Sequence, residues 1–129
     1  MKRPDAINHY VTLAEGDLSL ARHLAAHPEF DERFLGFHLQ QAAEKGIKAR
    51  MLARDISPPR THSLPALLST LERIDEAAAA FWDLVDLTPY AVQFRYEVPE
   101  PSGPMHHRLL SSLVEELIAK ARQAASDSA

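Results

Sequence analysis

Four polar side chains recur at helical spacing within the segment 37–64. His38, Gln41, Lys45 and Lys48 follow one another at intervals of three, four and three residues, which stacks them on one face of a helix. We call these four residues the polar seam. Lysine supplies ammonium donors, glutamine can read a base edge, and histidine can donate or accept a hydrogen bond. The seam therefore has the chemistry to contact phosphate or a base, and the alternatives are a subunit interface or a solvated strip.

A second candidate for ligand binding is the pair Arg95–Tyr96. It lies in the segment 90–104, whose three prolines and one glycine predict an extended loop. An arginine can clamp a phosphate while a neighbouring aromatic ring stacks on a base. The alternative is structural, with Arg95 paired to a carboxylate and Tyr96 packed against the rest of the protein.

Metal and cofactor chemistry find little support in the sequence. The chain has no cysteine, so thiolate metal sites and thiolate nucleophiles are excluded. His23 and His27 are four residues apart and could hold a metal together, but two ligands without a third do not make a usual zinc site. There is also no glycine-rich phosphate loop and no serine nucleophile motif. We expect neither a metal nor a cofactor.

The composition is that of one globular domain spanning residues 1–129. The chain is 46% hydrophobic and 25% charged, with a net charge of −4, which gives no global reason to expect nucleic-acid binding. No segment resembles a signal peptide, and no apolar run reaches membrane-spanning length. We expect a cytoplasmic protein that does not interact with a membrane.

The elements that must position these residues are helices. The periodicity of apolar residues predicts helices from about Pro4–Asp5 to Ala26, from about Asp31 to Arg54, from a Ser63 cap through Leu71, from an Asp75 cap to a break at Pro89, and from about Met105 to Ala124, with residues 123–129 as a frayed tail. This is an all-α fold, an up-and-down four-helix bundle with one additional short helix. The apolar arc of the second helix is unusually wide, which indicates a central helix with several neighbours.

Four segments together resemble the HEPN family, the "higher eukaryotes and prokaryotes nucleotide-binding" domains. They are AEGDLSLARHL on the first helix, FHLQQAAEKGIKARML on the second, PPRTHSLPALL after it, and YAVQFRYE before the last helix. The resemblance implies a helical bundle that forms a homodimer, and the wide arc of the second helix agrees with that. It also implies a minimal nucleotidyltransferase as partner, in an arrangement like a toxin–antitoxin pair, and a nucleotide or RNA as ligand.

Many members of that family are metal-independent ribonucleases that use the pattern Arg-x(4–6)-His near the start of the last long helix. Here Arg95 is followed by Tyr96, and the next histidine is His106, outside that spacing. The spacing does occur in three other places, Arg3 with His9, Arg22 with His27, and Arg33 with His38. None stands where the family has its catalytic pair, and three matches are a weak signal in a chain this rich in both residues.

Two hypotheses about function follow. The first is a HEPN-type nucleotide-binding or partner module for a minimal nucleotidyltransferase, which need not be catalytic. The second is a metal-independent ribonuclease with a non-standard arrangement, in which Arg95 stabilises phosphate charge and a histidine acts as acid or base.

Overall fold

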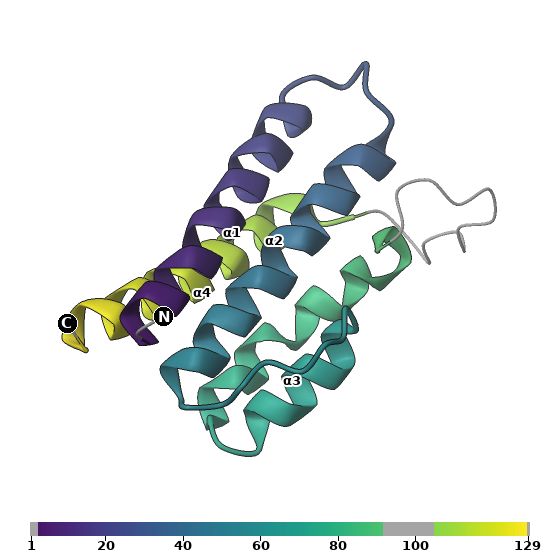
Figure 1. Ribbon diagram of the computed structural model, residues 1–129. Helices are drawn as coiled ribbons and strands as arrows, with labels where there is room; N and C mark the ends of the chain where they lie inside the picture. The colour runs from purple at the N-terminus through teal and green to yellow at the C-terminus, as the bar shows by residue number, and fades with distance from the viewer. Residues whose placement is uncertain (1–2, 92–104, 129) are drawn as a thin grey trace.

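The computed structural model describes residues 3–91 and 105–128, and these residues form five helices and no strand (Figure 1). The helices are α1 (Arg3–Ala25), α2 (Glu32–Ala53), α3 (Leu64–Glu72), the 3₁₀ helix η1 (Glu76–Tyr90) and α4 (His107–Asp127). The predicted all-α class is confirmed.

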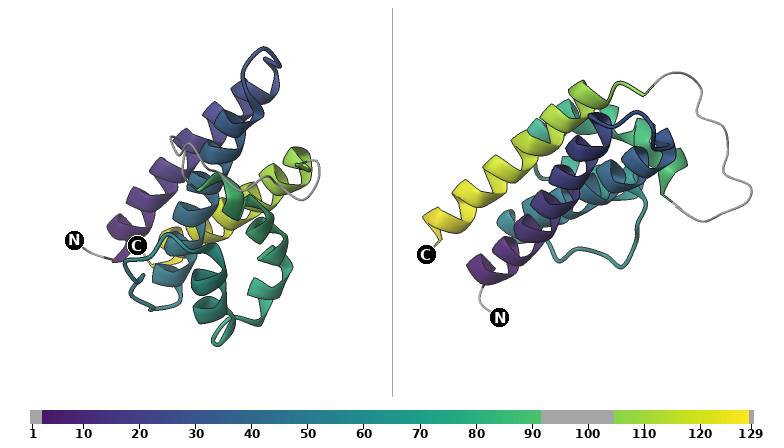
Figure 2. Two further views of the ribbon diagram at one scale, coloured as in Figure 1. Left: turned by 90° about the vertical axis from the view of Figure 1, so that its right-hand side faces the viewer. Right: turned by 90° about the horizontal axis from the view of Figure 1, so that it is seen from above.

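Helix α2 lies at the centre of the molecule. It packs against all four other helices, whereas α3 and η1 pack on each other and make no contact with α1. The three long helices α1, α2 and α4 run alongside one another, and α3 with η1 covers the far side of α2 (Figures 1 and 2). The wide apolar arc of α2 is therefore buried within one chain, through side chains such as Leu39, Ala43, Ile47 and Met51. The arc is therefore no evidence for a dimer, because the other helices of the same protomer already cover it.

Side chains cap three of the helices. Asp31 accepts a hydrogen bond from the backbone N–H of Arg33 (2.9 Å) at the start of α2. Ser63 begins α3 and Asp75 begins η1 in the same way, with distances of 3.3 and 3.1 Å. Such oxygens satisfy backbone donors that have no partner inside the helix. The caps expected at Ser63 and Asp75 are confirmed.

The end of α2 is closed by a Schellman motif. Asp55 adopts a left-handed backbone conformation with φ 60°. The N–H of Ile56 then reaches the carbonyl of Met51 (2.8 Å), and the N–H of Asp55 reaches that of Leu52 (3.1 Å). This turn directs the chain toward the Pro-rich segment before α3.

Two helices differ from the sequence prediction. The segment after Asp75 forms a 3₁₀ helix instead of an α-helix, and it ends at Tyr90, one residue after Pro89. Helix α4 continues to Asp127, so the tail that we expected to fray from residue 123 is helical. Ala121 and Ala125 are buried on that last stretch, and Arg3 donates a hydrogen bond to Ser128 Oγ (3.0 Å). These contacts hold the last turns of α4 against the start of α1 (Figure 1).

Candidate functional site

Two residues of the polar seam bind one carboxylate of α1. One carboxylate oxygen of Asp17 accepts a hydrogen bond from Lys45 Nζ at 2.5 Å. The other oxygen lies 3.2 Å from Nδ1 of His38. The three side chains are only 17–24% exposed, so this contact lies largely between α1 and α2. Asp17 was not among the predicted site residues. Its place beside the buried face of α1 could be read from the sequence, because Asp17 follows Ala14 by three residues and precedes Ala21 by four. The local spacing does not identify its partners.

A second carboxylate binds the next seam lysine. Glu44 is 5% exposed and lies 3.0 Å from Lys48 Nζ, on the same face of α2. Its two oxygens also lie 3.1 and 3.0 Å from Nδ1 of His62. Because a buried carboxylate needs polar partners, Glu44 takes the imidazole.

The remaining seam residue, Gln41, is part of an amide chain. Gln41 donates to the side-chain oxygen of Gln40 (2.7 Å), and Gln40, fully buried, donates to the carbonyl of His62 (3.4 Å). Every seam residue therefore has a partner in its own chain. The sequence pattern correctly placed the four residues on one face, yet that face joins α2 to α1 and to the segment before α3. A ligand role for the seam stays a prediction.

The other predicted site residues, Arg95 and Tyr96, lie outside the described residues. Their role as phosphate clamp and stacking ring remains a prediction from the sequence.

The arginines of the three Arg–His spacings are each bound by a carboxylate. The pairs are Arg3 with Asp55, Arg22 with Glu115 and Arg33 with Asp31. In the case of Arg33, two side-chain nitrogens and the backbone N–H all donate to Asp31. These hydrogen bonds, with the side chain of Arg33 first, lower the pKa of Asp31 to about 2. This contact therefore stabilises the first turn of α2, where Asp31 is the N-cap.

Histidines and carboxylates do not gather into a metal centre in residues 3–91 and 105–128. No group of three or more potential ligands lies together there, although the rings of His23 and His27 lie close to each other, tilted by 36° with centroids 4.4 Å apart. Among the described helices, none combines the length and apolar character of a membrane span.

Fold and contacts together define a helical bundle whose central helix carries polar side chains paired to two carboxylates, the buried Glu44 and the largely enclosed Asp17. The family model described as "HEPN domain" matches residues 7–126, nearly the whole chain. The chain belongs to the HEPN domain family, which confirms the resemblance found in its sequence. At the level of the family it is a nucleotide-binding or ribonuclease-like module. No curated protein and no solved structure matches the chain.

Proposed function

We propose that this chain is a nucleotide-binding or partner module of the HEPN type that acts in the cytoplasm with a minimal nucleotidyltransferase. The pair would be arranged like a toxin and its antitoxin, and the HEPN chain would bind without cleaving RNA. The observation that carries this proposal is the match to the HEPN family over residues 7–126, in a chain that has no Arg-x(4–6)-His pair near the start of its last helix.

The chemistry explains why this matters. A metal-independent ribonuclease needs a cation aimed at the charge that develops on the phosphate in the transition state. A guanidinium that donates to a neighbouring carboxylate would first have to break that contact. Arg22, for example, is held by Glu115 at 2.6 Å, and His27 of the same spacing lies 3.0 Å from Glu29. Both pairs are largely exposed, and contacts of this kind cost less than about 1 kcal/mol to break. The stronger argument against catalysis is that none of the three spacings stands where the family has its catalytic pair.

Arg95 is the residue that we propose for phosphate contact, with Tyr96 stacking on a base. The seam residues are weaker candidates because their partners are Asp17, Glu44 and Gln40. A guanidinium keeps its charge at any working pH and can grip phosphate through two parallel hydrogen bonds.

The experiment is a titration of a short single-stranded RNA with wild-type protein and with Arg95→Ala. Loss of a hydrogen bond to a charged group should weaken binding by about 1.5–3 kcal/mol, and Arg95→Lys should recover only part of it. Arg73→Ala is the matched control, because Arg73 is exposed at the end of α3. Unchanged affinity with a lowered melting temperature would show that Arg95 anchors the loop instead.

The partnership is tested separately. We expect a minimal nucleotidyltransferase to be encoded beside this chain and to copurify with it when the two are expressed together. A neighbouring frame of another kind, or a nucleotidyltransferase that elutes apart from the chain, would remove this part of the proposal. The ribonuclease alternative gains support only if the purified chain cuts RNA in the presence of a metal chelator and Arg95→Ala abolishes the cutting.

A further inference from the structure

Five residues form a stripe along the outward face of α1. All five are exposed, and they follow one another at intervals of four, three, four and three residues: His9, Leu13, Gly16, Leu20 and His23. We call them the outer stripe. Residues at these intervals lie on one side of an α-helix, and the same alternation of three and four is the spacing at which two helices pack along their length.

Charged side chains of α1 turn away from the outer stripe. Within residues 6–26, Glu15 and Arg22 are the only exposed acidic, lysine or arginine residues. Both form ion pairs with residues of α4, which are Arg122 and Glu115 in that order. The solvent-facing side of a helix is usually charged or polar, so an outward face without such residues needs another explanation.

The centre of the outer stripe is apolar and hollow. Leu13 and Leu20 are each 41% exposed, and Gly16 lies between them. Glycine is unfavourable inside a helix, and the described part of the chain does not require it here, because a Cβ at Gly16 would meet nothing within 4 Å. A glycine between two leucines leaves a hole that accepts a leucine of another helix, so two backbones can approach closely.

The outer stripe is complementary to a second copy of itself. In both directions from Gly16, a leucine comes next and a histidine after it. A second copy that runs antiparallel, related by a two-fold axis at Gly16, presents the same residues in reverse order. Leu13 of each copy then lies against Leu20 of the other, and His9 of each copy lies against His23 of the other.

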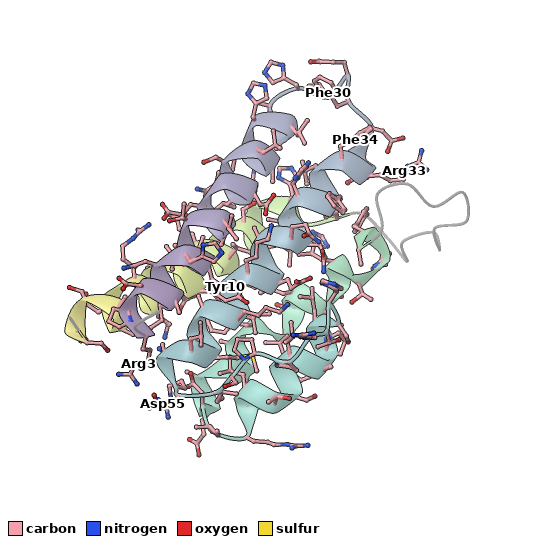
Figure 3. The ribbon with its side chains drawn as sticks, viewed as in Figure 1. Arg3, Tyr10, Phe30, Arg33, Phe34 and Asp55 are labelled. Atoms are coloured by element: carbon pink, nitrogen blue, oxygen red, sulfur yellow. The ribbon has the colours of Figure 1, made fainter. Side chains whose placement is uncertain are left out.

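His23 already has a second imidazole beside it. The ring of His27, in the turn that also carries Phe30 (Figure 3), lies with its centroid 4.4 Å from that of His23. Nδ1 of His27 is 3.0 Å from a carboxylate oxygen of Glu29, an arrangement that orients a ring and leaves Nε2 for a metal. One chain offers only two such ligands, and no group of three lies together within residues 3–91 and 105–128.

We propose that two copies of this chain pack along the outer stripe and bind a zinc-like divalent cation at each end of it. Each site takes His23 and His27 from one copy and His9 from the other, so neither copy holds a complete site. Three imidazoles and a water molecule match the zinc sites that keep one open position, and imidazole nitrogen suits zinc over magnesium. The site is independent of nucleotide binding, so its failure leaves the proposed function in place.

The first test is sedimentation of the whole chain at micromolar concentration in three buffers, which contain a chelator, Mg²⁺ or Zn²⁺. Zn²⁺ should tighten the dimer by about tenfold or more, because the complete site exists only in the paired state. Mg²⁺ prefers oxygen ligands and should have no effect. Equilibrium dialysis should find one zinc per chain. A chain that stays monomeric in Zn²⁺, or a dimer equally tight in all three buffers, overturns the metal site.

Mixing two variants tests whether the site is shared between copies. His9→Gln and His23→Gln each remove a ligand from both sites, so each variant alone should lose zinc binding. In a mixed dimer of the two, one site keeps all three of its histidines, and zinc binding should return in part. His106→Gln, a change at an exposed histidine outside the stripe, should bind zinc as the wild type does. Zinc binding by His9→Gln alone, or no recovery on mixing, overturns the shared site.

The contact face is tested without metal. Leu20→Ser should weaken the dimer by about tenfold or more in chelator, as for a leucine that loses its burial. Leu109→Ser, at a leucine of α4 that is 50% exposed, is the matched control and should have no effect. Gly16→Leu fills the hole and should prevent pairing, and melting temperatures should show that every variant folds. A Gly16→Leu dimer as tight as wild type, or equal effects of the two serine variants, overturns the outer stripe as the contact.

Discussion

At the scale of single residues, two carboxylates, Asp17 and Glu44, explain the positions of three of the four seam residues. The sequence pattern showed that His38 and Lys45 share a face, and in the structure they share Asp17. It could not show the partner, because Asp17 is 21 and 28 residues away along the chain and is brought near only by the packing of α1 on α2. Partners that depend on tertiary packing are not encoded in local spacing.

The Asp17 contact should matter for stability. Asp17→Ala leaves Lys45 largely enclosed without its carboxylate, so the free energy of unfolding should fall by about 1–3 kcal/mol, the range for an unsatisfied buried group. Glu15→Ala, also on α1, removes the exposed pair with Arg122 and should cost less than about 1 kcal/mol. Urea unfolding measures both. Equal losses in the two variants would mean that Asp17 acts as an ordinary surface charge.

At the scale of elements, capping residues made the starts of two helices predictable from the sequence. The helix type of η1 and the C-terminal end of α4 could not be predicted. Ser63 and Asp75 begin their helices as expected, since a cap is a local interaction. The 3₁₀ geometry of η1 could not be read from its alanine-rich sequence, which suits an ordinary α-helix. The extension of α4 beyond Ala124 depends on burial of Ala125.

A glycine comparison tests how closely α2 and η1 pack. A Cβ added at Gly36 would overlap the buried ring of Tyr90, whereas a Cβ at Gly16 would meet nothing within 4 Å. Gly36→Ala should therefore destabilise the protein by about 1–3 kcal/mol. Gly16→Ala, in the interior of α1, should stabilise it by about 0.5–1 kcal/mol. Thermal and urea unfolding measure both changes. A Gly36→Ala variant with an unchanged free energy of unfolding would show that the ring of Tyr90 can move aside.

The start of α2 should respond to pH through Asp31. Its pKa in the folded protein is about 2, below the usual 3.8, so the charged form stabilises the fold above that usual value. This contribution is lost as the pH falls through about 2. Asp31→Asn keeps a good cap but removes the charge. The urea midpoints of wild type and variant should differ at pH 6 and converge near pH 2. A difference between the two midpoints that stays the same at every pH would contradict the assignment. Asp83→Asn, a change at an exposed residue, serves as the control.

At the scale of the whole molecule, the homodimer stays a prediction. HEPN domains often dimerise, but the wide apolar arc of α2 no longer argues for it, because α1, α3, η1 and α4 cover that arc. Sedimentation at micromolar concentration should give twice the mass of one chain. A single species of 14.4 kDa would contradict the prediction.

Binding without cleavage is the central claim, and one sample can test it. A short RNA with a 5′-phosphate and a fluorescent 3′ end is mixed with the wild-type chain in the presence of a metal chelator. Its anisotropy is followed as protein is added, and the same sample is then run on a denaturing gel. The account predicts a saturable rise in anisotropy and RNA of full length on the gel. Shortened RNA, or no rise at any protein concentration, would contradict it.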